Sequence, residues 1–151
     1  MHTNFEELAT EHKQICSNNK CCIDSKIAVE NGMRFEIFSN EAFIKIRIDG
    51  CLIKSLEIEK CDFGFYRKSN EDIYFIELKG KQINKAFDQI VSTINYFESS
   101  LIKTPKNQRF GFIVSTKVPS AGTDIKNLIQ KFKRDFGKDL KIKNQVLHYN
   151  V

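Results

Sequence analysis

The chain has 151 residues, of which 41% are hydrophobic and 28% are charged; these values exclude a disordered chain and favour one globular domain over residues 1–151. No apolar run is long enough to span a bilayer, and the first residues lack a secretory leader, so we expect a soluble, cytoplasmic protein without a membrane partner. The 24 Lys and Arg outnumber the 19 Asp and Glu, a net charge of +5, which suits a polyanionic partner and equally an ordinary basic surface.

The first helix is predicted to begin after Asn4, with Glu7 three residues later as in a capping box. Apolar side chains then recur at helical spacing as far as Ile15. The turn-rich stretch 16–20 is expected to end this helix.

The cysteines form no recognisable framework. An odd count of five, in a chain that lacks a leader, argues against disulfides. The spacing Cys-x4-Cys-Cys, with no second ligand pair, does not favour zinc. We therefore expect reduced, partly buried thiols at Cys16, Cys21, Cys22, Cys51 and Cys61.

From residue 33 to residue 79 the pattern is that of β-strands, rich in β-branched and aromatic residues. Turns are indicated at Asn40, at Asp49–Gly50 and in the polar segment RKSNED. The predicted strands are RFEIF (34–38), AFIKIRI (42–48), CLIKSLEI (51–58), CDFGFY (61–66) and IYFIELK (73–79).

The clearest helix follows Gly80, because one apolar stripe recurs every three or four residues from Ile83 to Leu101. A strand is predicted over 109–116, a second amphipathic helix over 122–137, and one or two edge strands over 140–151. This order predicts a mixed α/β domain in which a crossover helix joins two parallel strands.

Two charged residues interrupt the most apolar strand. Glu77 and Lys79 lie on one face of it, at its C-terminal end, where ligands usually meet an α/β sheet. A hairpin centred between Ser69 and Asn70 pairs residues whose numbers sum to 139, so Asp62 faces Glu77 with β-carbons about 5 Å apart. Opposed carboxylates repel unless a divalent cation lies between them. The plain alternatives are a solvated edge strand carrying an ion pair, and a surface acid near a turn.

This combination resembles the PD-(D/E)xK nuclease superfamily. The resemblance covers residue 61 to about residue 93: CDFGFY, a hairpin turn, IYFIELKG and a helix beginning INKAFDQI. The chain departs from the name motif in having Cys61 where that motif has Pro. The resemblance implies a restriction-endonuclease-like core, a central mixed β-sheet flanked by helices in α-β-β-β-α-β order. It also implies metal-dependent cleavage of phosphodiesters, usually in DNA.

The resemblance also implies roles for particular residues. Asp62, Glu77 and the backbone carbonyl of Leu78 would hold Mg²⁺, with Mn²⁺ able to substitute. Lys79 would orient or deprotonate the attacking water, or stabilise the developing charge. Gln89 would hold a phosphate or Lys79 in place; an exposed helical Gln is the alternative.

Members of the superfamily often place a further acid from the first helix near the metal. Glu11 is the candidate here, since Glu7 has a capping role, although a structural role is the more ordinary interpretation of both.

Basic residues flank the motif, and they are candidates for phosphate contacts around this site. A solvated basic surface is the alternative for the group as a whole. They are Lys81, Lys85, Lys103, Lys106 and Arg109.

Four functions remain open at this point. The first is a DNA endonuclease of restriction or defence type, alone or with a partner protein. The second is a Holliday-junction-resolvase-like nuclease acting as a homodimer on branched DNA. The third is a non-catalytic nucleic-acid-binding module on the same fold, and the fourth is an unrelated α/β interaction protein in which the hairpin register is accidental.

Overall fold

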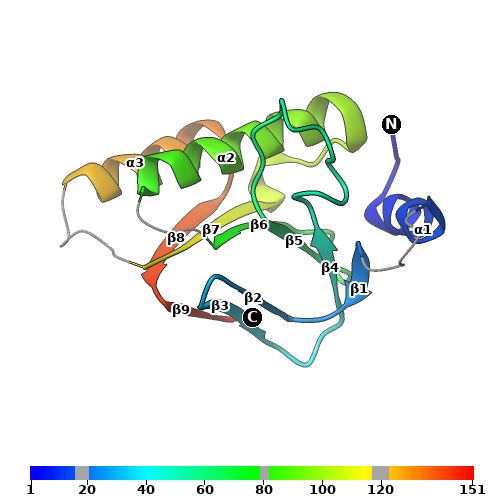
Figure 1. Ribbon diagram of the computed structural model, residues 1–151, viewed down its shortest axis with the longest axis horizontal. Coiled ribbons are helices and arrows are strands. Elements are labelled where there is room, and N and C mark those ends of the chain that lie inside the picture. The colour runs from blue at the N-terminus through cyan, green and yellow to red at the C-terminus, as the bar shows by residue number, and fades with distance from the viewer. Residues whose placement is uncertain (16–20, 79–81, 117–122) are drawn as a thin grey trace.

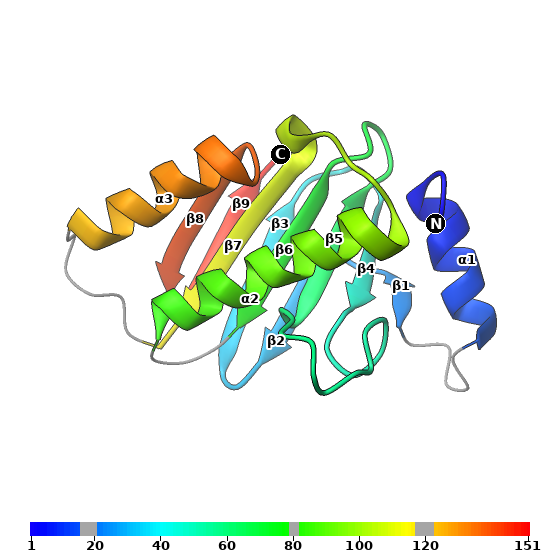
Figure 2. The same cartoon turned by 90° about the horizontal axis from the view of Figure 1, so that it is seen from above.

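The structure is a computed structural model that describes residues 1–15, 21–78, 82–116 and 123–151. A six-stranded mixed sheet forms the middle layer, with α2 and α3 across one face, α1 beside the β1–β4 edge and a three-stranded sheet beneath the other face (Figures 1 and 2). The coarse prediction of a mixed α/β domain with a large mixed sheet is therefore confirmed.

The large sheet has the order β1-β4-β5-β6-β7-β8, and the small one β2-β3-β9. The helices are α1 (Phe5–Ile15), α2 (Ile83–Tyr96), which continues into a π turn over Phe97–Leu101, and α3 (Thr123–Asp135). The strands are β1 (Cys22–Asp24), β2 (Ile27–Glu30), β3 (Met33–Phe38), β4 (Phe43–Arg47), β5 (Phe63–Arg67), β6 (Ile73–Leu78), β7 (Arg109–Ser115), β8 (Asp139–Asn144) and β9 (Val146–Asn150).

The predicted hairpin register is confirmed. In β5 and β6, Phe63 pairs with Ile76 and Phe65 pairs with Tyr74, so the residue numbers of each pair add up to 139 as predicted. The crossover prediction is also confirmed, because α2 carries the chain from β6 to β7 and these strands are parallel. At the N-terminus, Asn4 caps α1 by accepting the N–H of Glu7 at 2.8 Å.

Strand β6 lies in the interior of the molecule, with all six of its residues buried. Its Ile73 and Phe75 pack in the core beneath the helices, whereas Tyr74 and Ile76 pack in the core between the two sheets. Alternation therefore places Glu77 on the helix-facing side. The alternative of a solvated edge strand is wrong for Glu77.

Two strand predictions differ from the structure. Residues 51–58 form a loop, because backbone bonds from Leu52 to Arg47 and from Ile53 to Ile48 fold the chain back on itself. Leu52 and Ile53 are buried but Leu56 is 96% exposed, so the apolar residues anchor a loop rather than line a strand. Strands β1 and β2 were not predicted. The β2–β3 turn uses Asn31 (φ 55°) and Gly32 (φ 76°), the pattern of a tight hairpin turn.

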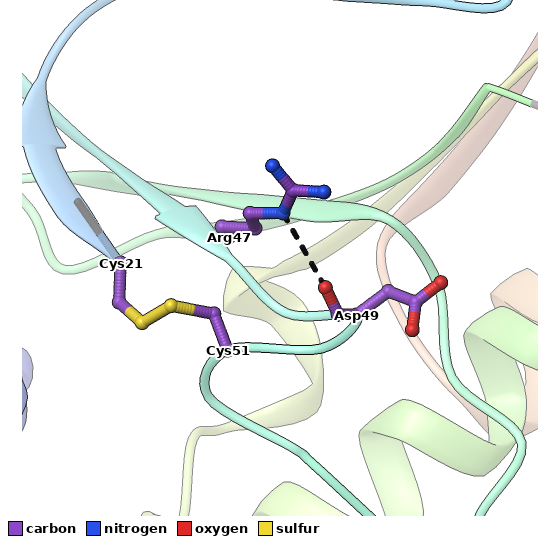
Figure 3. The surroundings of a disulfide bond; sticks show 4 residues. All are labelled: Cys21, Arg47, Asp49 and Cys51. Atoms are coloured by element: carbon purple, nitrogen blue, oxygen red, sulfur yellow. Dashed lines mark hydrogen bonds between the residues drawn. A yellow bond between two sulfur atoms is a disulfide. The ribbon is translucent and has the colours of Figure 1, made fainter. Parts of the chain in front are cut away.

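Contrary to the expectation of reduced thiols, Cys21 and Cys51 form a disulfide (Figure 3). Cys21 lies beside β4, where its carbonyl accepts the N–H of Arg47. The loop after β4 brings Cys51 back to Cys21, so that their Cα atoms are 5.6 Å apart. An odd cysteine count does not preclude one bridge between residues that the sheet places together. Cys22 and Cys61 are buried, and Cys16 lies outside the described residues.

Across the part of the chain that the structure describes, none of the helices has the length and apolar character that crossing a membrane requires.

Candidate functional site

Asp62 and Glu77 form a buried acidic pair at the C-terminal end of β6. Asp62 directly precedes β5 and is 4% exposed; Glu77, in β6, is 0% exposed. The paired register ends at Phe63 and Ile76, one residue before the two acids, and the N–H of Asp62 bonds to the carbonyl of Ile76. The acids are therefore neighbours across the end of the hairpin, although the strand pairing does not extend to them.

Reciprocal hydrogen bonds hold the two carboxylates. The N–H of Leu78 donates to Asp62 Oδ2 at 2.8 Å, and the N–H of Asp62 donates to Glu77 Oε1 at 3.1 Å and also to the Ile76 carbonyl at 3.1 Å. Each carboxylate is thus bonded to the backbone of the other strand. Hydrogen bonds to charged acceptors are roughly twice as strong as neutral ones, which helps to offset the burial of like charges.

A third acid, Glu30 at the end of β2, reaches Asp62 from the small sheet. Burial raises the pKa of Glu30, and the negative charge of Asp62 and a hydrogen bond between the two side chains raise this pKa further. The next residue, Asn31, donates from Nδ2 to the carbonyl of Leu78 at 3.4 Å. The β2–β3 turn therefore covers the end of β6, next to the acids.

Sequence reasoning missed Glu30 and Asn31. The Asn-Gly pair at 31–32 is a strong hairpin signal that could have located the turn. Nothing local indicates that this turn packs against a strand 47 residues further along the chain.

Two cations of β4, Lys45 and Arg47, also lie near Glu30. Burial lowers the pKa of Lys45, and the positive charge of Arg47 lowers it further, whereas the charge of Glu30 raises it. The Lys45 ammonium lies 4.7 Å from the centre of the Phe63 ring. Arg47 donates from Nε to the carbonyl of Asp49 (Figure 3).

Helix α2 is fastened to the residue before Asp62. The N–H of Cys61 donates to Thr93 Oγ1 at 2.8 Å, and this hydroxyl donates to the carbonyl of Gln89 at 2.7 Å. Gln89 is only 8% exposed, so the alternative of an exposed helical Gln is wrong. Burial and then the charge of Glu77 raise the pKa of the Cys61 thiol well above its usual range, which keeps the neighbour of the acids neutral.

Three predicted site groups fall outside what the structure describes. Lys79 and Lys81 belong to the segment 79–81, and the side chain of Glu11 in α1 is likewise outside the described part. Their predicted roles remain predictions.

The predicted phosphate-binding residues do not all gather around the acids. Lys85 is exposed in the first turn of α2, close in sequence to the end of β6. Arg109 pairs with Ile73 at the beginning of the parallel β6–β7 ladder, about 13 Å along the strand from Glu77, and forms a 3.0 Å ion pair with Glu98. Lys103 and Lys106 precede Arg109 at that same end. Lys103, Lys106 and Arg109 therefore do not lie around the acidic pair, and this part of the prediction is wrong.

The donor set of the site fits a hard cation. Asp62, Glu77 and the Leu78 carbonyl offer only oxygen, and Mg²⁺ usually takes one or two carboxylates and keeps several waters. Within residues 1–15, 21–78, 82–116 and 123–151, no three His, Cys, Asp or Glu side chains lie close enough together to form a complete protein cage for a metal. Any ion held here would therefore keep much of its water shell.

Comparison with known proteins yields no match to a family model, a curated protein or a solved structure.

Proposed function

We propose that the protein is a metal-dependent nuclease that hydrolyses phosphodiester bonds in DNA, with a restriction-endonuclease-like core. The observation that carries the proposal is the buried pair of Asp62 and Glu77, joined by reciprocal hydrogen bonds at the C-terminal end of a central strand. The order of α1, the β4–β5–β6 meander, the crossover helix α2 and parallel β7 supports it.

Each residue at the site has a distinct role in this proposal. Asp62, Glu77 and the Leu78 carbonyl would hold Mg²⁺ or Mn²⁺. When bound, the ion would lower the pKa of a coordinated water and offset charge on the phosphate. The backbone bonds to both carboxylates keep these ligands oriented before the ion arrives. Lys79, two residues after Glu77, would orient the attacking water or accept its proton. Gln89, a buried residue of α2, would position Lys79 or a phosphate oxygen.

The test is cleavage by purified protein of labelled duplex, single-stranded and four-way-junction DNA and of RNA, with Mg²⁺, with Mn²⁺ and with chelator. We expect cutting of DNA that requires the metal and is lost in Glu77→Gln. The matched control is Glu59→Gln, which neutralises an exposed acid in the loop between β4 and β5 and should cut like wild type. Lys79→Ala should lose turnover but keep metal binding, because an ammonium is not a metal ligand.

The site assignment fails if Glu77→Gln cuts as fast as wild type. The nuclease proposal fails if the wild type cuts no substrate with either metal. Preference for the four-way junction would identify the resolvase-like alternative.

A further inference from the structure

The positive charge of the chain is concentrated near its C-terminal end. Residues 123–144 contain seven basic and three acidic side chains, a net charge of +4, and the rest of the chain carries only +1 of the total of +5. These residues form α3, the turn after it and β8. One edge of the molecule therefore accounts for nearly all of its net charge.

Helix α3 turns its charged side outward. Leu128, Ile129 and Phe132 pack against the core, whereas Lys126 and Lys131 are exposed. Helix α3 and β8 together form the edge of the molecule farthest from α1 (Figure 2). Within the described residues no carboxylate lies within 4.0 Å of Lys126, Lys131, Lys138 or Lys143, so their charges are available to a partner.

Two surface hollows meet where α3 ends. The first, of about 480 Å³, is lined by Lys106, Asn107, Lys133, Gly137 and Lys138, without any acid. The second, of about 500 Å³, shares Lys133 and Lys138 and also contains acidic side chains. Lys133 and Lys138 thus line both hollows.

The cations at this junction keep their charge exposed. Lys133 is 54% exposed and lies 3.6 Å from Asp139, a distance too long for a strong hydrogen bond. Lys138 is exposed, with its ammonium 5.9 Å from the centre of the Phe110 ring. Lys106 donates to the carbonyl of Arg134, at the C-terminal end of α3, and so offsets the negative end of the helix dipole there.

We propose that this basic surface, termed the α3–β8 face and consisting of α3, Lys138 and the lysines of β8, binds the phosphate backbone of duplex DNA. The choice of DNA rather than another polyanion rests on the proposed function. The 13 residues of α3 span about 20 Å, the length of about six base pairs measured along the duplex axis. Because α3 runs back towards the start of β7, it connects the end of the sheet that holds the acidic pair with the two hollows (Figure 2).

The experiment measures binding of a fluorescently labelled 30-base-pair duplex by anisotropy, in chelator, between 50 and 300 mM salt. Lys133→Gln/Lys138→Gln should weaken binding and reduce the slope of log affinity against log salt by about 1.8, which is two phosphate contacts at about 0.9 each. Lys133→Arg/Lys138→Arg keeps both charges and should bind like wild type. Lys54→Gln/Lys68→Gln removes the same charge from exposed positions outside the face, and it should also bind like wild type. Melting curves establish that every variant is folded.

Equal weakening by the Lys133/Lys138 and Lys54/Lys68 pairs would overturn the proposal, because it would mean that only net charge matters. An unchanged affinity in Lys133→Gln/Lys138→Gln, or no binding of duplex by wild type, would overturn it as well. Binding in chelator does not depend on catalysis, so DNA bound at the α3–β8 face without any cleavage would refute the nuclease proposal alone. If the protein cleaves DNA with metal and Lys133→Gln/Lys138→Gln binds DNA like wild type, only the proposal for the α3–β8 face is refuted.

Discussion

Among single residues, Thr93 links helix α2 most directly to the acidic pair. Its buried hydroxyl accepts the N–H of Cys61 and donates to the carbonyl of Gln89. Since Cys61 immediately precedes Asp62, this contact determines where the chain carrying the first acid meets the helix.

Replacing Thr93 with Val keeps the shape of the side chain but leaves the N–H of Cys61 buried without its acceptor. The expected cost is about 1–3 kcal/mol in the free energy of unfolding, measured by urea denaturation. Thr93→Ser retains the hydroxyl and should recover most of this loss. Equal stability of the Val variant and wild type would mean that the hydrogen bond contributes nothing.

Asp62 is expected to destabilise the metal-free protein. It lies against Glu77, and its charge contributes to the raised pKa of Glu30. Asp62→Asn should therefore raise the metal-free stability by about 1 kcal/mol or less, since the amide oxygen can still accept the N–H of Leu78. Melting in chelator measures this difference, and Glu59→Gln serves as the control.

Added metal should reverse the order of stability, making wild type more stable than Asp62→Asn. Mg²⁺ or Mn²⁺ at about 100 times the dissociation constant should stabilise wild type by about 2.7 kcal/mol, because the ion binds only the folded pair. Asp62→Asn should gain much less. An equal shift in both proteins would exclude Asp62 as a ligand.

The acidic pair itself was predictable from the sequence, whereas its surroundings were not. Asp62 and Glu77 are 15 residues apart in a hairpin, so a turn position and strand alternation suffice to bring them together. Glu30 and Asn31 arrive from another sheet, and Thr93 from a helix whose rotation about its axis decides which polar side chain is buried. Periodicity predicts the apolar stripe of a helix, but not which polar residue beside it contacts a neighbour.

Between elements, an exposed network joins the β3–β4 loop to the β5–β6 hairpin. Glu41 accepts hydrogen bonds from Arg67 and from Ser69. These hydrogen bonds, chiefly that from Arg67, lower the pKa of Glu41 to about 2. A carboxyl whose pKa is depressed on folding stabilises the folded state above its unfolded pKa, and the stabilisation disappears as the pH falls to the folded value.

Glu41→Gln should therefore be less stable than wild type at pH 7. The difference should shrink as the pH falls from about 4.5 to about 2, where Glu41 itself becomes protonated. Urea denaturation at a series of pH values measures it. A difference that does not change over this range would show that the charge of Glu41 is not responsible.

The helices and strands that the sequence predicted best are those whose apolar pattern continues without interruption. Strand β6 is apolar on both faces, and α2 repeats its apolar stripe over its whole length. The loop 51–58 was mistaken for a strand because its apolar residues alternate, although Gly50 (φ 77°) turns the chain just before it. Strands β1 and β2 are only three and four residues long, too short for a periodic pattern.

At the scale of the whole molecule, the three layers depend on contacts that no local pattern contains. Strand β9 lies parallel to β3, with Leu147 opposite Phe35, so the small sheet joins the two ends of the chain. Phe35, Tyr74 and Phe112 then fill the space between the sheets. The sequence predicted the large sheet, but the second layer follows only from this long-range pairing.

The disulfide acts on the molecule as a whole because it closes a long covalent loop. Cys21 and Cys51 are separated by 30 residues, and the loop between them contains β1 to β4 and therefore the turn that covers the end of β6. Cys51→Ser should lower the free energy of unfolding by about 3–4 kcal/mol, measured by urea denaturation without reductant. Reductant should destabilise wild type by a similar amount and leave the variant unaffected.

The reciprocal hydrogen bonds at the acidic pair have a spectroscopic consequence. The amide protons of Asp62 and Leu78 both point at carboxylate oxygens. A carboxylate changes its charge when it takes up a proton and changes its field when it binds a cation, so the chemical shifts of these two amides follow the state of the site. In a nitrogen–proton correlation spectrum of nitrogen-15-labelled protein, these two amides are thus internal reporters of the acids, and they respond without substrate, attached probe or mutation.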